Sequence, residues 1–281
     1  MTSGHPLPVR PPLRWAGSKR RSLTTLRALC PRQITHYFEP FAGSACLTFS
    51  LAAEKVTIAD LNPYLIEFYQ YLKADPEALY SRFSQILRDE DEYYRVRQEF
   101  NNSPASIERA SYFLYLNRYC FNGIYRVNKS GKFNVPWGGR HVGEALQLRH
   151  LKEASAHLAN TEIRCADFQD IALSARPGAF IYLDPPYAAN EKRVFREYVA
   201  NSFSSSDWGR FVETLEELDR RNIQFLLTYD GDPSLLKSLS RWNSGFHDVT
   251  RNVGGFRATR RTHREFIARN FDEGSGSEHG N

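Results

Sequence analysis

An apolar run that ends in Asp-Pro-Pro-Tyr constrains the fold of this chain more than any other stretch. Residues 179–183 read Ala-Phe-Ile-Tyr-Leu and follow the turn signal Pro177-Gly178. A short continuous apolar run of this kind predicts a strand that is buried on both faces, as in a parallel sheet. Open α/β sheets bind their ligands at the carboxyl ends of such strands, where residues 184–187 lie. The sequence therefore predicts an α/β fold with a functional site at Asp184.

The chemistry of these four residues suits a planar group that carries an NH2. The two prolines have no N–H, so the local backbone offers only carbonyl acceptors. Asp184 adds a carboxylate and Tyr187 adds an aromatic face, which together fit a nucleobase amino group. The alternative is a rigid turn with a solvated Asp, because both Asp and Pro are common in turns.

Three stretches before residue 62 predict the start of the same sheet. Residues 13–19 read Leu-Arg-Trp-Ala-Gly-Ser-Lys and precede a helical pattern that ends at Pro31, so a helix entrance with a buried Trp is the simpler alternative. Residues 37–49 read as a short strand, a Gly turn and a helix start, and helix N-termini suit carboxylates or phosphates. Residues 55–60 form a second strand that ends in Asp60. An acid there binds ribose hydroxyls in related α/β units, although Asp60 also fits the turn Asp-Leu-Asn-Pro.

The strand–helix alternation stops between residues 62 and 117. Apolar residues recur at helical spacing, and proline-led helix starts are expected at Asp75-Pro76 and Ser103-Pro104. About fifty residues of helix within an α/β pattern indicate an inserted helical domain.

Residues 117–140 combine Asn-Gly, Ser-Gly and Gly-Gly turn signals with aromatic and basic side chains. A loop or hairpin with this many donors suits the backbone and base edges of DNA. A solvated basic loop is the alternative, but a surface loop without a binding role would carry fewer aromatic residues. The basic residues are Arg118, Arg126, Lys129, Lys132 and Arg140.

From residue 143 the α/β pattern resumes. It predicts a helix to about residue 157, a strand at 161–166 that ends at Asp167-Phe168, and a helix at 206–221. Strands are also expected at 223–229, near 246–250 and at 263–269.

Composition places few further limits on function. The net charge of +5 favours a polyanionic partner only modestly. The four cysteines are scattered without a CxxC pair, which predicts reduced core or near-core thiols in a cytosolic protein and no zinc site. No apolar run approaches the length that spans a membrane, and the first twelve residues lack the apolar segment of a signal peptide.

Taken in order, these motifs resemble the Dam-type (D12 class) DNA adenine-N6 methyltransferase family. The resemblance covers about residues 13–270, and the order and spacing are more specific than any single motif. Asp-Pro-Pro-Tyr is typical of adenine-N6 enzymes, whereas Ser-Pro-Pro-Tyr is typical of cytosine-N4 enzymes. The resemblance is carried by Trp-Ala-Gly-Ser-Lys at 15–19, Phe-Glu-Pro-Phe-Ala-Gly-Ser at 38–44, Ala-Asp-Leu-Asn at 59–62, the basic segment, Asp-Phe at 167–168 and Asp-Pro-Pro-Tyr at 184–187.

The resemblance implies a Rossmann-like fold that uses S-adenosyl-L-methionine (AdoMet). This fold has a mostly parallel seven-stranded sheet and an inserted helical target-recognition domain with a β-hairpin. Residues 1–61 and 143–271 would form the AdoMet-binding catalytic domain, residues 62–142 the target-recognition domain, and residues 272–281 a disordered tail.

The resemblance also assigns the site residues. The catalytic set is Asp184, Pro185, Pro186 and Tyr187. The cofactor-binding set is Trp15, Lys19, Glu39, Phe41, Ala42, Gly43, Ser44, Asp60, Asp167, Phe168 and Asp184. Residues 41–44 would cradle the methionine part, Asp60 would hold the ribose, and Asp167 and Phe168 would bind the adenine ring. No metal ion and no covalent enzyme intermediate is expected.

The expected partner is double-stranded DNA, bound by a cytoplasmic monomer that flips the target adenine out of the duplex. The implied DNA-binding residues are Arg14, Asn122, Ile124, Arg126, Lys129, Lys132, Pro136 and Arg140. Relatives with these features methylate GATC, although Arg14 stands where they usually carry Lys and Arg140 where they carry Tyr. The segment 188–201 is expected to order on DNA binding. Two other functions stay open, an AdoMet-dependent methyltransferase of an RNA amino group and a catalytically silent nucleic-acid-binding protein.

Overall fold

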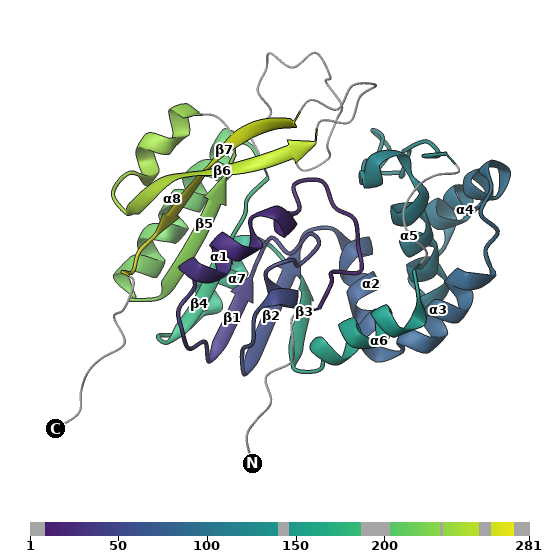
Figure 1. The fold of residues 1–281 in the computed structure, drawn as a ribbon, viewed down its shortest axis with the longest axis horizontal. Coiled ribbons are helices and arrows are strands. Elements are labelled where there is room, and N and C mark those ends of the chain that lie inside the picture. The colour runs from purple at the N-terminus through teal and green to yellow at the C-terminus, as the bar shows by residue number, and fades with distance from the viewer. Residues whose placement is uncertain (1–8, 140–145, 187–202, 231–232, 253–259, 273–281) are drawn as a thin grey trace.

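The computed structural model describes residues 9–139, 146–186, 203–230, 233–252 and 260–272. Its centre is one seven-stranded sheet with the order β3-β2-β1-β4-β5-β7-β6 (Figure 1). The first five strands in this order are parallel, whereas β7 runs antiparallel to both of its neighbours. The mostly parallel seven-stranded sheet is therefore confirmed. The strands are β1 (His36–Glu39), β2 (Lys55–Asp60), β3 (Thr161–Cys165), β4 (Ala179–Leu183), β5 (Gln224–Tyr229), β6 (Asn243–Asn252) and β7 (Arg260–Arg269).

Strand β4 lies in the middle of the sheet and is buried along its whole length, as the apolar run predicts. Because successive side chains of a strand point to opposite faces, β4 contributes to two cores. Phe180 and Tyr182 pack with α1 (Leu23–Leu29) on one face. Ile181 and Leu183 pack with α7 (Phe168–Ser174) and α8 (Ser205–Arg220) on the other. This double burial fixes the position of Asp184 at the end of the strand.

Four helices follow β2 between residues 63 and 119, as the pattern of residues 62–117 predicts. They are α2 (Pro63–Ala74), α3 (Pro76–Gln85), α4 (Glu90–Asn102) and α5 (Ile107–Tyr119). Asn62 caps α2 and Asp75 caps α3, and each cap is followed by proline at the first helical position. The predicted start at Ser103-Pro104 is wrong, because Ser106 accepts the capping hydrogen bond and α5 begins at Ile107.

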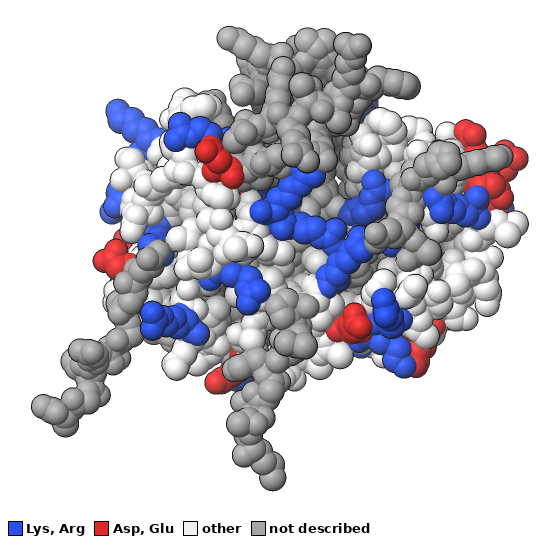
Figure 2. Space-filling model, in the orientation of Figure 1, with Lys and Arg blue, Asp and Glu red and all other residues white. Residues whose placement is uncertain are grey.

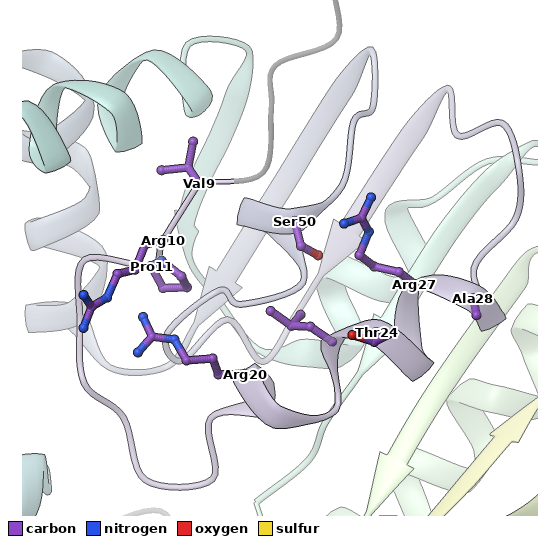
Figure 3. Close-up of a pocket in the computed structure, with 9 residues that line it drawn as sticks. Val9, Arg10, Pro11, Arg20, Thr24, Arg27, Ala28 and Ser50 are labelled. Carbon is purple, nitrogen blue, oxygen red and sulfur yellow. The ribbon is translucent and has the colours of Figure 1, made fainter.

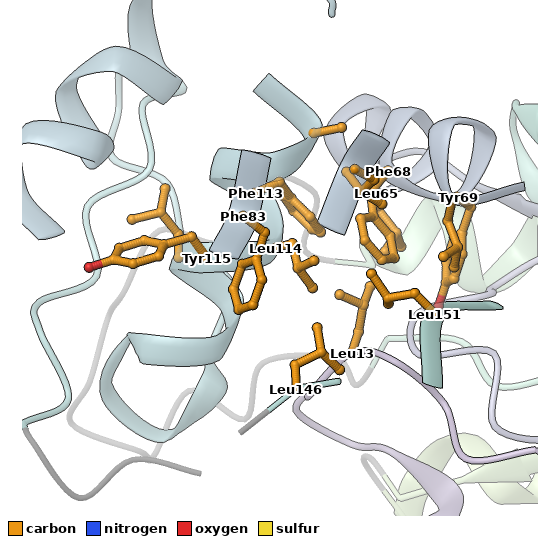
Figure 4. Close-up of a cluster of buried hydrophobic side chains, with 14 of the residues drawn as sticks. Leu13, Leu65, Phe68, Tyr69, Phe83, Phe113, Leu114, Tyr115, Leu146 and Leu151 are labelled. Carbon is orange, nitrogen blue, oxygen red and sulfur yellow. The ribbon is translucent and has the colours of Figure 1, made fainter. Parts of the chain in front are cut away.

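The helical region shares one hydrophobic core with the nearby edge of the sheet. In this cluster Leu65, Phe68 and Tyr69 of α2 pack with Phe113 of α5 and with Leu151 of α6 (Leu148–His157), as Figure 4 shows. The cluster also includes Ala42, Ala45, Phe49 and Ile58, which lie before the predicted boundary at residue 61. The division into two domains therefore stays a prediction. In Figure 1 the helices α2–α5 stand beside β3, at the end of the sheet opposite to β6.

Several smaller expectations differ from the structure. The helix expected after residue 44 is only a short 3-10 turn, η2 (Thr48–Ser50). Helix α6 ends at His157 as predicted, whereas α7, which Asp167 caps, is absent from the predictions. All four cysteines are free thiols, and Cys46 and Cys120 are buried as expected, whereas Cys165 is exposed. The described part of the chain holds no helix long and apolar enough to cross a membrane.

Candidate active site

The carboxylate of Asp184 is held in one orientation at the carboxyl end of β4. Its side chain is 20% exposed. Its Oδ1 atom accepts a hydrogen bond from the Oγ1 of Thr228, on β5, at 2.9 Å, and lies 2.8 Å from the Nζ of Lys19. Both donors act on the same oxygen, so rotation of the carboxylate breaks two interactions at once. This geometry leaves Oδ2 as the oxygen on which neither donor acts.

Lys19 connects Asp184 to a second carboxylate, Glu265 on β7. Lys19 is 6% exposed and Glu265 is 1% exposed, and their Nζ and Oε1 atoms lie 3.0 Å apart. The third N–H of the ammonium reaches the carbonyl of Gly17 at 3.3 Å, so all three donors have acceptors. One buried ammonium thus stands between two carboxylates, so removal of Lys19 would leave both Asp184 and Glu265 without the positive charge that compensates them.

The surroundings of Asp184 act on its pKa in opposite directions. Burial raises the pKa of Asp184 most strongly, the ammonium of Lys19 lowers it, and the charge of Glu265 raises it further. A hydroxyl chain supports the same carboxylate. Because Thr228 gives its only proton to Asp184, its oxygen accepts from the O–H of Tyr182, 2.8 Å away.

The loop after β1 and the end of β2 meet beside this cluster. The N–H of Gly43 donates to Oδ2 of Asp60 at 3.1 Å, and the N–H of Asn62 donates to Oδ1 at 2.9 Å. Burial raises the pKa of Asp60, and these backbone donors oppose the shift. Gly43 has φ +47°, and a Cβ there would lie 2.9 Å from the ring of Trp15. The structure therefore requires glycine at this turn and brings Trp15, Gly43 and Asp60 together.

Glu39 lies at the end of β1 and is almost fully buried. Its Oε2 accepts from the O–H of Tyr37 at 2.9 Å, from the N–H of Thr48 at 3.0 Å, and from the hydroxyl of Thr48. Burial raises the pKa of Glu39 to about 7, although these three donors lower it. The carboxylate thus fastens the end of β1 to η2, which shapes the loop that residues 41–44 form.

Phe41, Phe168 and Asp167 form the side of the site next to α7. The rings of Phe41 and Phe168 stack with centroids 5.2 Å apart, and Phe203 meets both. Asp167 caps α7 by accepting from the N–H of Gln169 at 2.9 Å, and its Oδ1 also lies 2.6 Å from Nη2 of Arg210. The predicted cofactor residues that end or follow β1, β2 and β3 therefore lie at the carboxyl-terminal ends of these parallel strands.

The basic segment reverses direction without forming a regular hairpin. The N–H of Asn128 bonds the carbonyl of Lys132 at 2.8 Å, which closes the turn. The described arms are joined by two isolated antiparallel bridges, Cys120 with Trp137 and Val127 with Phe133, and by single hydrogen bonds such as that from Nε of Arg126 to Oδ1 of Asn134. The predicted β-hairpin is therefore a turn with two bridges. Of the predicted DNA-binding residues in this segment, Ile124 and Arg126 are half-buried, and Asn122, Lys129, Lys132 and Pro136 are exposed.

Arg14 and Trp15 join the basic segment to the cofactor loop. The guanidinium of Arg14 donates to the carbonyl of Arg118 at 2.9 Å, and a Cβ on Gly123 would lie 2.8 Å from that of Arg14. The ring of Trp15 stacks on Tyr125 with centroids 5.8 Å apart. Arg14 thus has a structural contact within the protein, and its predicted contact with DNA stays a prediction.

Some predicted residues cannot be placed, and some placed residues were not predicted. Tyr187, Arg140 and the segment 188–201 lie outside the described residues. The described residues contain no cluster of His, Cys, Asp and Glu that could hold a metal ion. The sequence prediction gave no role in the site to Glu265, Thr228 or Tyr182. The one available signal is that Glu265 is a charged residue directly before the apolar Phe-Ile-Ala of a predicted strand.

Comparisons with known proteins identify relatives of similar length. The model of the D12 class N6 adenine-specific DNA methyltransferase family matches residues 15–253. The Type II methyltransferase M1.LlaDCHI of Lactococcus lactis is 30% identical over 94% of this chain and 96% of its own length. The Type II methyltransferase M.MjaIII of Methanocaldococcus jannaschii is 35% identical over 78% of this chain and 84% of its own. A DNA adenine methylase of Haemophilus influenzae is 30% identical over 82% of each chain.

Proposed function

Because this chain belongs to the D12 class N6 adenine-specific DNA methyltransferase family, we propose that it transfers a methyl group from AdoMet to N6 of an adenine in duplex DNA. The target base is flipped out of the helix, since N6 of a paired and stacked adenine cannot reach a buried carboxylate. The proposed target sequence is GATC, and the enzyme acts as a cytoplasmic monomer.

The observation that carries this proposal is the fixed orientation of Asp184. Lys19 and Thr228 both act on Oδ1. We therefore assign Oδ2 as the oxygen that accepts one hydrogen of the target amino group, with the carbonyl of Pro185 accepting the other. Pro185 follows Asp184 in the sequence and is buried. As a proline it has no backbone N–H that could compete for an acceptor.

These acceptors address the main difficulty of the reaction, which is the poor nucleophilicity of an aromatic amino group. The N6 lone pair is delocalised into the ring. Two acceptors that bind both amino hydrogens draw the nitrogen toward tetrahedral geometry and stabilise the positive charge that develops there. When bound, AdoMet supplies an already activated sulfonium methyl. The remaining task of the protein is to align the two reactants in line.

The residues around Asp60 fit AdoMet. Each oxygen of Asp60 accepts one backbone N–H and retains capacity for another bond, as two ribose hydroxyls require. The turn at Gly43 brings backbone close to Trp15, with no side chain in between. Phe41 and Phe168 provide an aromatic wall for the adenine ring. The ammonium of Lys19 donates to Asp184, Glu265 and Gly17. We therefore assign Lys19 to positioning Asp184 and not to direct contact with the cofactor.

One experiment tests this proposal against its alternatives. Purified protein is incubated with labelled AdoMet and either duplex DNA with GATC sites or structured RNA, and the products are digested to nucleosides. The proposal predicts N6-methyladenine in DNA alone. Label in RNA would support the RNA methyltransferase, and DNA binding without transfer would support the silent binding protein. Label in N4-methylcytosine would contradict the adenine assignment.

A further inference from the structure

The positive charge of this chain is concentrated in its first 38 residues. These positions hold seven of the 37 Lys and Arg residues and none of the 32 Asp and Glu residues. The other 243 residues hold 30 basic and 32 acidic side chains, so the net positive charge comes entirely from the N-terminal segment. Such an asymmetry points to a polyanionic partner at the surface where this segment lies.

Two of these seven residues are buried or half-buried. Lys19 is buried with Asp184 and Glu265, and Arg14 is half-buried against the carbonyl of Arg118. The other five are exposed. Figure 2 shows Lys and Arg side chains gathered in the middle of one face, over the N-terminal segment that is purple in Figure 1. The exposed residues are Arg10, Arg20, Arg21, Arg27 and Arg32.

Three of the exposed arginines line a single pocket (Figure 3). The pocket has a volume of about 780 Å³, and no acidic side chain lines it. In Figure 3 Arg10 and Arg20 lie on one side of the pocket and Arg27 lies on the other. Apolar side chains and two hydroxyls complete the lining, from Val9, Pro11, Leu23, Ala28, Thr24 and Ser50.

The place of this pocket in the fold relates it to the catalytic centre. Arg20 directly follows Lys19, whose ammonium lies 2.8 Å from Asp184. The short helix η1 (Lys19–Arg21) thus turns Lys19 inward and Arg20 outward. From there the pocket extends along α1, on the face of the sheet opposite to α7 and α8. Adjacent residues of η1 thus carry the ammonium that contacts Asp184 and a guanidinium that lines the pocket.

We propose that this pocket binds the phosphate backbone of duplex DNA outside the recognition sequence, on the flank that crosses α1. Guanidinium groups match phosphate geometry bidentately, and the apolar lining suits deoxyribose. Such contacts are independent of base sequence and add to affinity through counterion release. This inference rests on the proposed function, because it extends the footprint of the same substrate.

The test compares a long duplex, in which the flanks of one GATC site reach about fifteen base pairs, with a short duplex in which they reach about three. The double variant Arg20→Gln/Arg27→Gln is the probe. Arg220→Gln, on the opposite face in α8, removes a similar charge and is the control. For the long duplex, we expect the slope of log affinity against log salt concentration to fall in magnitude by about two in the double variant. The control keeps the wild-type slope, and on the short duplex all three proteins agree in slope and in methylation rate.

Distinct results would overturn the inference. A wild-type slope for the double variant on the long duplex would remove the pocket from the DNA footprint. If the slope fell equally on both duplexes, the pocket would contact phosphates within the recognition sequence or would bind a small anion, and either result would contradict the inference. The single variant Arg27→Gln controls for disturbance of Lys19 and Asp184, because Arg27 lies farther from Lys19 in the chain than Arg20 does. For this variant we expect the salt-dependence slope on the long duplex to fall in magnitude by about one. If the wild-type protein methylates neither duplex, the proposed function itself fails.

Discussion

The catalytic end of the sheet and the described part of the basic segment, residues 117–139, are held together in different ways. At the catalytic end, polar side chains from distant parts of the chain hold one another, as Lys19 joins Asp184 of β4 to Glu265 of β7. In the basic segment, backbone bonds such as Asn128 to Lys132 and a layer of aromatic rings set the shape. All six of its predicted DNA-binding residues that the structure describes are half-buried or exposed.

This difference separates what must stay fixed from what can vary. A change in any member of the buried cluster alters the charge balance around Asp184, so the reaction constrains all of them together. A change in an exposed side chain of the basic segment leaves the turn and the aromatic layer intact. We therefore expect variants of the first region to lose rate and variants of the second to change which DNA is chosen.

The largest expected effect comes from Asp184→Asn. The amide keeps the shape but removes the charge that stabilises the attacking nitrogen, so kcat should fall by about 100- to 1000-fold or more. AdoMet affinity should change little, because the assigned partner of Asp184 is the target amino group. Single-turnover methyl transfer and calorimetric titration of AdoMet measure the two quantities. Near-normal turnover would refute the chemistry assigned to this residue.

Asp60→Asn should show the reverse pattern within the same region. Hydrogen bonds to a charged group contribute about 1.5–3 kcal/mol, so AdoMet affinity should fall by roughly 10- to 150-fold. At saturating AdoMet the methylation rate should recover most of its wild-type value. Asp170→Asn, an exposed acid in α7, is the matched control and should leave the affinity unchanged. A lower rate that excess AdoMet does not restore would place Asp60 in the chemistry.

Glu265→Gln tests whether the buried cluster acts on Asp184 through charge. Lys19 loses one of its two anions, so we expect kcat to fall about tenfold through misplacement of Asp184. The active form is the ionised carboxylate, and activity is lost as the pH falls through its raised pKa. Because the charge of Glu265 raises the pKa of Asp184, its removal should move the acidic limb of the pH–rate profile to lower pH.

A merely structural role for Glu265 gives a different result. It would lower the rate equally at every pH and leave the acidic limb in place. Glu265→Asp keeps the charge and should retain the wild-type limb at a reduced rate. Thr228→Val removes one donor to Oδ1 of Asp184 without a change in net charge, and since that donor lowers the pKa, its acidic limb should move to higher pH.

The same contrast explains what the sequence could predict. The strands, the carboxyl-end site and the turn at Gly43 follow from local patterns, because apolar runs and turn residues act on their immediate neighbours. Glu265 and Thr228 reach Asp184 only through the sheet, which places β5 beside β4 and β7 beside β5 and so brings together residues that lie 44 or more positions apart in the chain. A sequence pattern contains no such register. The start of α5 was misplaced for a simpler reason, since Ser106 competes with Ser103 as the cap and the structure selects Ser106.

The sharpest test of the contrast compares Arg126→Ala with Lys129→Ala. A guanidinium can bond both O6 and N7 of guanine in the major groove, whereas an ammonium is a point charge suited to phosphate. Loss of a bidentate base contact should weaken binding to GATC by about 1–3 kcal/mol and reduce specificity at one outer base pair. Loss of a phosphate contact should weaken all sites alike and flatten the salt dependence.

The structure adds a control to this comparison. Nε of Arg126 donates to Oδ1 of Asn134 at 2.8 Å across the turn, so Arg126→Ala also removes an internal bond. Asn134→Ala removes the same bond but keeps the guanidinium. If Arg126→Ala lost specificity for GATC and Asn134→Ala retained it, the effect would be due to loss of a base contact by Arg126. The measurements are methylation rates on GATC and on its singly substituted variants at two salt concentrations. Equal losses on every substrate for Arg126→Ala would place it with the phosphate contacts, and the choice of GATC would then depend on other residues of the segment.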